Sequence, residues 1–500
     1  MSSAARVDER LEWVMHQQFD RLLAALESDD ADGRPAIGRE VLGEVLARVV
    51  FKAPEEISRA EIADPEERRP VDRMTLTPGT VSKAVKVLIE RNLLEIGTSS
   101  LQRATGRPVL PLRLSSGWTV AGVKVTHHNT RPVAVATVLT ALDGTVLRKR
   151  EPVPLPSPSS PTDDVWPQIA RIAKDEIDSI KADDDNTRVR EGRAASELLG
   201  AGVEVGGHVF EGQVVLSDYS RQSGTAPLAH MLESLLQKPV VVENDVNALA
   251  VMATRQRNYG SLDMVVVAVY DEGVGGGLVM DGRVRRGGHG AAMEIGHLPV
   301  ERQDEVAEHA SAATDRDVPG FSDACWCTQF GHVEVLATPS RIRGELGVTD
   351  LQAAAATPSV DAEGNHTREY RVFTRAGTGL GRGLAHTITL VNPGRLILKL
   401  PPVLIEYSPE KAASAYLTAV KREINTVFST GAADAELIVE AFDDVLVTGA
   451  RAAAVCVIDA FIEHLRGLDG CQTPGRRRSD DPTSRKNHGM TAAREDIGAA

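Results

Sequence analysis

The sequence predicts an α/β protein with two strand-rich lobes, preceded by a small helical unit that ends in two short strands. Three observations predict this fold. Residues 37–93 have helical periodicity, whereas strand patterns alternate with helices after residue 115. A strand–turn–strand pattern opens each of two regions in that second part. Finally, the valines at 240–242 run directly into three polar residues, which is typical of a buried parallel strand that ends at a site.

Composition limits the possible classes of protein. A chain of 500 residues that is 42% hydrophobic and 25% charged is long enough for about three domains. No apolar run approaches the roughly 20 residues of a membrane span, and the first residues lack the apolar segment of a secretion signal. We therefore expect a cytoplasmic protein with no membrane partner. The four cysteines are too few for a disulfide scaffold, and the formal net charge of −14 excludes a protein that coats nucleic acid with its whole surface.

We expect residues 1–35 to form a helical extension and linker, and residues 36–115 to form a winged helix-turn-helix domain. Helical patterns occupy 38–50, 58–63 and 78–91, and either Thr77 or Thr80 can cap the last of them. Two short strands around a basic loop follow, which is the pattern of a wing.

The predicted third helix and wing carry a local excess of positive charge. From residue 73 to 113 there are seven Lys and Arg residues against two Glu, in a chain that is acidic overall. DNA phosphate is the natural partner of such a patch. The alternative is an ordinary solvated helix face, but the order of helices and basic wing favours a double-stranded DNA operator as partner. The candidate DNA-binding residues are Thr80, Ser82, Lys83, Lys86, Arg103 and Arg107.

Residues 116–470 are expected to form the two lobes, at about 116–250 and 251–430, with a C-terminal helix that packs back on the first lobe. Within the first lobe we expect a charged, mobile loop at 181–196, after a helix. Residues 471–500 are polar and nearly free of large apolar side chains, which predicts a disordered tail.

Three motifs together carry a family resemblance: PVVVENDVNALA, DEGVGGGLVMDGRVRRGGHGAAMEIGHLPV and CWCTQFGHVE. With the winged helix upstream, they resemble the ROK family of repressors and sugar kinases, over residues 40–460 or so. This resemblance implies an actin-like ATPase, ribonuclease-H-like fold of two lobes, with a sugar bound in the cleft between them and a structural zinc ion beside it.

The resemblance also implies five sugar-contacting residues: Asn244, Asp245, Glu294, His297 and Glu334. Carboxylates accept hydrogen bonds from vicinal hydroxyls, and an Asn amide both donates and accepts them, so this set suits a polyol. In the family kinases the residue matching Asp245 is the general base. The alternative is that residues 243–247 simply cap a helix. Residues 217–219, Ser-Asp-Tyr, stand where the family offers another sugar-binding Asn, which leaves the sugar's identity open.

A zinc site is implied by the same resemblance. The family pattern is Cys-x-Cys-Gly-x-x-Gly-Cys with an additional His, and here Cys325, Cys327 and His297 match it, while His332 replaces the third Cys. Two Cys and two His are an accepted tetrahedral zinc set, and a closed set of four ligands is structural rather than catalytic. The alternative is a pair of free thiols in a reducing cytosol.

The nucleotide-binding turns of the family kinases are altered. Such turns need glycines, because only a bare backbone lets amide N–H groups approach phosphate. At the first turn this chain has residues 124–128, Lys-Val-Thr-His-His, and at the second it has 271–273, Asp-Glu-Gly. The adenine-side Gly-Gly turn is replaced by 399–401, Lys-Leu-Pro. These losses argue against catalysis, so we expect Asp245 to bind a ligand without acting as a base.

The sequence therefore predicts a transcriptional regulator, a repressor that is not an enzyme and that responds to a sugar or sugar phosphate as effector. Its partners are operator DNA and further copies of the same chain, with which it forms a homodimer or a homotetramer. Two alternatives remain open: an ATP-dependent sugar kinase with a DNA-binding domain attached, and a constitutive regulator that no longer responds to sugar.

Overall fold

The computed structural model describes most of the chain between residues 37 and 467. The described ranges are 37–65, 72, 74–97, 110–128, 131–156, 164–216, 226–255, 263–301, 325, 327, 329–426 and 435–467. The predicted N-terminal extension and the predicted disordered tail both lie outside these ranges.

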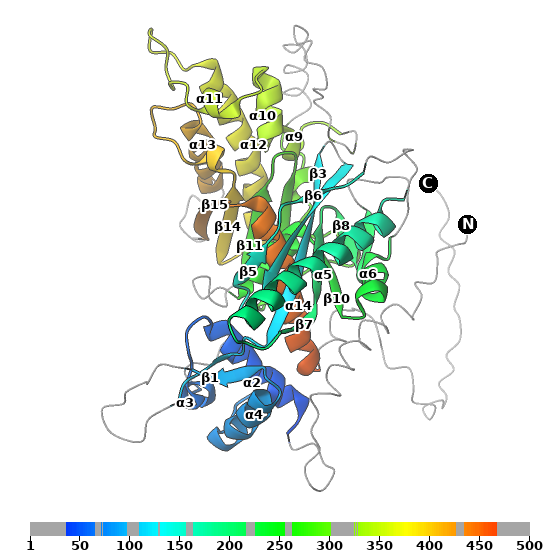
Figure 1. The fold of residues 1–500 in the computed structure, drawn as a ribbon. Coiled ribbons are helices and arrows are strands. Elements are labelled where there is room, and N and C mark those ends of the chain that lie inside the picture. The colour runs from blue at the N-terminus through cyan, green and yellow to red at the C-terminus, as the bar shows by residue number, and fades with distance from the viewer. Residues whose placement is uncertain are drawn as a thin grey trace, which may run out of the picture.

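A unit of helices with a two-stranded ribbon comes first, and we call residues 37–114 the N-terminal unit (Figure 1). Its elements are α2 (Arg39–Lys52), α3 (Arg59–Ala63), α4 (Pro78–Glu90), β1 (Leu94–Ile96) and β2 (Leu112–Leu114). The side chain of Thr77 accepts a hydrogen bond from the Thr80 backbone N–H, so Thr77 caps α4. Strands β1 and β2 pair antiparallel, as the sequence predicts for the wing.

The first of the larger sheets has the strand order β10-β7-β3-β4-β5, with β6 also paired to β4. These strands are β3 (Trp118–His128), β4 (Arg131–Thr140), β5 (Val146–Lys149), β6 (Val153–Pro154), β7 (Glu197–Val205) and β10 (Val240–Asn244). Strand β7 runs parallel to both β3 and β10. Helices α5 (Trp166–Arg190) and α6 (Leu228–Leu236) pack on this sheet, and the hairpin β8 (His208–Phe210) with β9 (Gln213–Leu216) lies between β7 and α6 in the chain.

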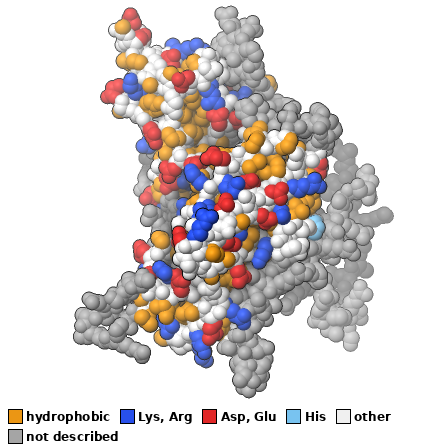
Figure 2. All heavy atoms as spheres, viewed as in Figure 1, with side chains coloured by type: hydrophobic (Ala, Val, Ile, Leu, Met, Phe, Trp, Pro, Cys, Tyr) orange, Lys and Arg blue, Asp and Glu red, His pale blue; other side chains and the backbone are white. Residues whose placement is uncertain are grey.

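The expectation of a mobile loop at 181–196 is wrong for its first ten residues, because α5 continues to Arg190. Ion pairs one helical turn apart support this acidic stretch, including Lys181–Asp185 and Asp184–Arg188, both at 2.5 Å. Asp184 and Arg188 are buried, and Arg188 also donates to the Ser116 carbonyl. Figure 2 shows Lys, Arg, Asp and Glu side chains interspersed across this face of the molecule.

The second of the larger sheets has the order β13-β12-β11-β14-β15. Its strands are β11 (Met264–Val269), β12 (Val274–Met280), β13 (Arg283–Val284), β14 (Arg395–Leu400) and β15 (Glu436–Ala441). The other elements of this part are η2 (Ile295–His297), α9 (Glu334–Ala337), α10 (Pro339–Leu346), α11 (Leu351–Ala355), α12 (Arg368–Val391), η3 (Pro402–Leu404) and α13 (Ser414–Thr426). Helices α9, α10, α12 and α13 share one hydrophobic core with β11 and β14.

Helices α7 (Asp245–Thr254) and α14 (Val445–Leu465) join the two sheets, because both contribute to a core that also contains residues of β11 and β12. Helix α14 also packs on β3 and β7 and extends down to the N-terminal unit (Figure 1). It is long and apolar enough to cross a membrane, with a mean hydropathy of 1.9, so the expectation that no apolar run approaches a membrane span is wrong for this helix. However, 61% of that stretch is buried inside the fold. Such burial is typical of a core helix.

Candidate ligand-binding site and metal centre

The predicted ligand residues Asn244 and Asp245 lie where β10 ends and α7 begins. The Asn244 side-chain oxygen accepts hydrogen bonds from the backbone N–H groups of Val246 and Asn247, both at 3.0 Å, so Asn244 caps α7. Its amide group donates to the Gly207 carbonyl at 2.9 Å. The helix-cap interpretation of this motif therefore describes Asn244 correctly. Asp245 is buried, and burial raises the pKa of its carboxyl group although Lys124 opposes the shift.

The other three predicted ligand residues come from the second part of the fold. Glu294 precedes η2, His297 is the last residue of η2, and Glu334 begins α9. His297 Nδ1 lies 4.0 Å from Glu334 Oε1, and Glu294 is close enough to Asp245 for its charge to raise the pKa of that carboxyl further. The structure thus brings together the side chains that the sequence predicts as a set. We call these five residues the ligand cluster.

A contact that the sequence did not predict involves Glu294. His208 Nε2, on β8, lies 3.1 Å from Glu294 Oε1. Since His208 belongs to the hairpin beside the first sheet and Glu294 to the second part, this contact joins the two parts of the fold. A ligand that hydrogen-bonds to Glu294 Oε1 would compete with His208, whereas Oε2 is a second acceptor on the same carboxylate.

The predicted zinc ligands also converge. One ligand atom from each of His297, Cys325, Cys327 and His332 lies within 4.8 Å of all the others. Cys325 Sγ is 3.4 Å from His297 Nδ1, and Cys327 Sγ is 3.6 Å from His332 Nδ1. Tetrahedral zinc with these donors requires ligand–ligand separations of about 3.3–3.8 Å, so the donor set fits the ion.

The environment of the cysteines supports a cation at this position. Cys325 is buried, with Sγ 2.7 Å from Glu334 Oε1. Burial, with the contact to Glu334, raises the pKa of the Cys325 thiol, so this thiol stays neutral unless a bound metal cation stabilises its thiolate. Glu334, a member of the ligand cluster, therefore also contacts the metal donors Cys325 and His297.

Lys124, at the first altered nucleotide turn, forms a buried ion pair with Glu204. The two residues are neighbours in the parallel pairing of β3 and β7, and Glu204 is fully buried. Burial alone would lower the pKa of Lys124, but Glu204 and Asp245 outweigh it and raise that pKa, so the amine stays charged. Burial raises the pKa of Glu204 to about 7. The Lys124 ammonium also lies 5.1 Å from the centre of the Tyr270 ring.

The other two altered turns also carry internal ion pairs. Asp271 pairs with Arg343 of α10 at 2.6 Å, and Lys399 of β14 pairs with Glu440 of β15 at 2.5 Å. At each of the three altered turns, a charged side chain is therefore engaged by another residue of the chain.

Four of the six predicted DNA-contacting residues lie on α4. Ser82, Lys83 and Lys86 are exposed, and Thr80 is half-buried near the start of the helix. Lys86 Nζ lies 3.7 Å from Glu90 Oε1, but both side chains are more than half exposed. Arg103 and Arg107 lie outside the described residues.

The sequence did not predict a set of buried charged residues at the C-terminal end of α14. Arg466 Nη2 lies 3.0 Å from Glu44 Oε2 and 3.7 Å from Asp72 Oδ1, and Arg48 contacts the same two carboxylates. Glu44 and Arg48 are one helical turn apart, but Asp72 and Arg466 are distant from them in the sequence, so no local pattern shows that the four residues meet.

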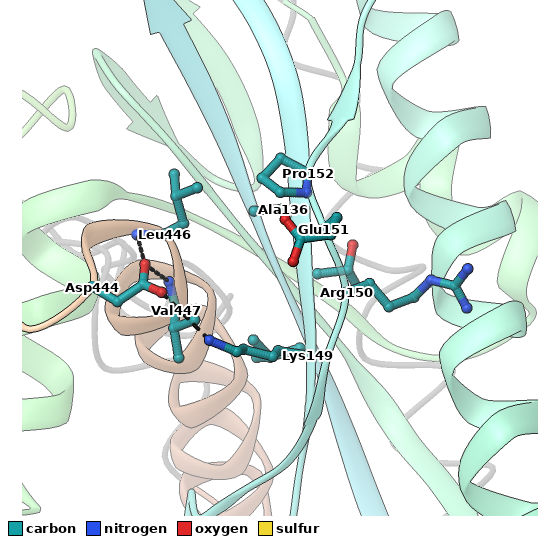
Figure 3. A pocket seen from close by; sticks show the side chains of 10 residues that line it. Ala136, Lys149, Arg150, Glu151, Pro152, Asp444, Leu446 and Val447 are labelled. Carbon is teal, nitrogen blue, oxygen red and sulfur yellow. Dashed lines mark hydrogen bonds and ion pairs between the residues drawn. The ribbon is translucent and has the colours of Figure 1, made fainter.

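A small pocket elsewhere in the fold contains none of the predicted site residues. It lies between the edge of β4 and β5 and the start of α14, where Lys149 pairs with Asp444 at 3.8 Å (Figure 3). Asp444 accepts hydrogen bonds from the backbone N–H groups of Leu446 and Val447, and so caps α14. These contacts account for the polar groups of the pocket that Figure 3 joins by dashed lines.

Comparison with known proteins agrees with this fold and site. Residues 188–433 match the model of the ROK family. The N-acetylmannosamine kinase of Vibrio cholerae serotype O1 is 34% identical over 123 residues, which cover 25% of this chain and 36% of the kinase. The DNA-binding transcriptional repressor Mlc of Escherichia coli K12 is 24% identical over 230 residues, covering 41% of this chain and 50% of Mlc. The chain thus spans about a third to a half of the length of these curated relatives.

Among solved structures, a ROK family transcriptional regulator described as a homologue of the E. coli MLC protein superposes with a TM-score of 0.56. It is 20% identical in sequence, and the match covers 86% of this chain and all of the other, so it shows a shared fold. The mixed α/β architecture is thereby confirmed as that of ROK proteins. This chain contains a ROK family domain.

Proposed function

We propose that this protein is a sugar-responsive, DNA-binding transcriptional regulator, a repressor whose ROK domain binds an effector and does not transfer phosphate. The observation that carries the proposal is the buried Lys124–Glu204 ion pair at the first nucleotide turn. A metal-bound triphosphate needs acidic groups and free backbone N–H groups at that turn. Here a lysine replaces the acid, and it is already paired.

The backbone beside Lys124 supports the same proposal. Thr126 pairs with Ala134, and residues 127 and 128 pair with 132 and 131 across a bulge. Strand β3 thus continues to residue 128 in place of a glycine turn, and its backbone there follows the sheet. Asp245 then serves as a hydrogen-bond acceptor for sugar hydroxyls, together with the rest of the ligand cluster.

The N-terminal unit would supply the DNA contacts as a winged helix-turn-helix domain. Its helix α4 has an exposed face with Ser82, Lys83 and Lys86, and the β1–β2 ribbon follows directly. That order of elements allows α4 to enter a major groove while the ribbon lies on the backbone. A cytoplasmic homodimer or homotetramer with a structural zinc ion at His297, Cys325, Cys327 and His332 completes the proposal.

Selection of DNA sequences by the full-length chain, followed by binding measurements at fixed salt, tests the DNA part. We expect Lys83→Ala to weaken binding and to lower the slope of log affinity against log salt by about one. Lys421→Ala, an exposed lysine on α13, is the matched control and should change neither quantity. Failure to enrich any DNA sequence would overturn the regulator proposal.

A sugar kinase is the second candidate, and one observation favours it. Burial raises the pKa of Asp245, which is the direction expected for a general base that works near neutral pH. A coupled assay of ATP consumption over a panel of hexoses separates the two functions. We expect no sugar-dependent turnover, and turnover that Asp245→Asn abolishes would establish the kinase instead.

A regulator that no longer responds to sugar is a third possibility, and it is favoured by the engagement of Asn244 as a helix cap and of Glu294 by His208. Thermal-shift measurements with neutral and phosphorylated sugars test it. A ligand present at 100 times its Kd adds about 2.7 kcal/mol of stability, so a binding sugar gives a measurable shift. No shift with any sugar would favour the constitutive regulator.

A further inference from the structure

Helix α14 touches the buried ion pair beside the ligand cluster. A Cβ atom added at Gly449 would lie 2.7 Å from Glu204 Cδ and 2.8 Å from Lys124 Cδ, so no side chain fits between the helix and this pair. Lys124 is in turn coupled electrostatically to Asp245 of the ligand cluster. A change in charge at Asp245 would therefore act electrostatically on the ion pair that contacts α14.

The same helix approaches the backbone of the first sheet closely at two glycines. A Cβ atom at Gly122 of β3 or at Gly202 of β7 would collide with the α14 backbone, at the carbonyl groups of Ala450 and Ala453 respectively. Such backbone-to-backbone packing leaves no adjustable side chain to absorb a displacement. The helix can therefore move against the sheet only as a body.

At its other end α14 is joined to the N-terminal unit through apolar packing. Phe461, Ile462 and Leu465 share a continuous core with α2 and α4. The approach is again close, since a Cβ atom at Gly43 of α2 would lie 2.8 Å from Leu465 Cβ. The last turns of α14 are thus part of the hydrophobic core of the N-terminal unit.

A buried ion cluster fixes this junction in one orientation. Arg466 Nη2 reaches both Glu44 and Asp72, whose side chains are 1% and 0% exposed, and Arg48 lies between the same carboxylates. Arg466 also pairs with Glu463 at 3.2 Å. Because Arg48 belongs to the N-terminal unit, rotation of that unit away from Arg466 would leave two buried carboxylates with a single arginine, which is unfavourable.

We propose that α14 is a rigid strut that couples the Lys124–Glu204 pair to the orientation of α2 and α4, with Arg466 as the positioning residue at the lower end. This inference rests on the proposed function for its biological use, because it supplies the route by which an effector at Asp245 would reorient the DNA-contacting helix. The coupling itself requires neither sugar nor DNA to be observed. Its physical basis is the chain of direct contacts described above.

Amide hydrogen exchange of the full-length protein tests the strut without either ligand. Gly449→Ala drives a methyl group against Glu204 and so perturbs the upper end of the helix. We expect exchange in α2 and α4 to change by about fivefold or more, the lower end of typical coupling between sites. In an Arg466→Met background, Gly449→Ala should no longer affect α2 and α4, while it should still affect β3 and β7.

Two further variants make the result decisive. Arg255→Met removes another ion pair of α14, with Asp459, that does not involve the N-terminal unit, and transmission should survive it. If Arg466→Met unfolds the N-terminal unit, Arg466→Lys takes its place because it keeps a cation. The effect of Gly449→Ala on exchange in α2 and α4 should then be reduced. Unchanged exchange in α2 and α4 in Gly449→Ala, with altered exchange in β3 and β7, would overturn the strut, as would undiminished transmission in Arg466→Lys. Neither result bears on whether the protein binds DNA or sugar, which the selection and thermal-shift experiments decide.

Discussion

The pH dependence of stability should contain a distinct contribution from Glu233, a buried carboxyl group on α6. Glu233 is 3% exposed, and its Oε1 accepts a hydrogen bond of 3.1 Å from the backbone N–H of Val240, the first residue of β10. Burial raises the pKa of Glu233 from 4.5 to about 7, although the hydrogen bond from Val240 opposes the shift. The Glu233 carboxyl group, which positions the start of β10, is therefore protonated in the folded protein over a pH range where the same group is ionised in the unfolded chain.

The sign and size of the effect follow from this shift. Because the pKa is higher in the folded state, the folded protein binds more protons between pH 4.5 and 7, and stability falls as the pH rises through that window. A shift of about 2.5 units at about 1.36 kcal/mol per unit gives a loss of roughly 3 kcal/mol, which is complete above pH 7. Glu233→Gln cannot ionise, and its side-chain oxygen can still accept the hydrogen bond from Val240.

Denaturation midpoints of the wild type and Glu233→Gln at pH 5, 6, 7 and 8 measure this contribution. We expect the variant to gain stability relative to the wild type steadily from pH 5 to pH 7 and then to remain level. Glu363→Gln, at an exposed position in the loop before α12, is the matched control and should give a constant difference. A difference between wild type and Glu233→Gln that does not change with pH would show that Glu233 is ionised in the fold and would refute the reasoning.

Three further predictions concern the site. Lys124→Met should destabilise the fold by about 3–5 kcal/mol because it leaves Glu204 buried without its cation, and Lys124→Met with Glu204→Met should recover most of that loss in chemical denaturation. Protein purified without added metal should contain about one zinc per chain by elemental analysis, and His332→Ala should lower that content, whereas zinc-free wild type would contradict the metal centre. Glu294→Gln should abolish the thermal shift given by a binding sugar, and an unchanged shift would place the ligand elsewhere.

Elements with strong local signals were predicted from the sequence. The capped, amphipathic segment before Arg91 forms α4, and the valine run forms the parallel strand β10 that ends at the polar pair Asn244 and Asp245. Both signals depend on neighbouring residues: a side chain that caps the helix, and an unbroken run of β-branched residues. Local structure was therefore the part of the fold that the sequence could specify.

The loop expected after Lys181 gave composition more weight than the pairs Lys181–Asp185 and Asp184–Arg188, which are one helical turn apart and visible in the local sequence. The contact of Arg188 with the Ser116 carbonyl, by contrast, joins residues that are distant in the sequence. In the same way, Glu204 gains its importance only from the strand pairing that places it beside Lys124. No window of local sequence contains both members of such a pair.

The ligand cluster illustrates how the fold constrains its own proposed response. Glu294 is held by His208, which belongs to the hairpin beside the first sheet, while Asp245 is coupled to Lys124 within that sheet. A sugar that hydrogen-bonds to both carboxylates and takes the place of His208 at Glu294 Oε1 would also alter the charge balance around Lys124. The first change loosens a contact between the two parts of the fold. The second acts at the Lys124–Glu204 pair, where α14 has no space to adjust. One binding event would therefore perturb both the contact between the two parts and the packing of α14. Only a ligand with hydroxyls spaced to reach both carboxylates could do so, which is why the two residues together, rather than either alone, define the proposed effector site.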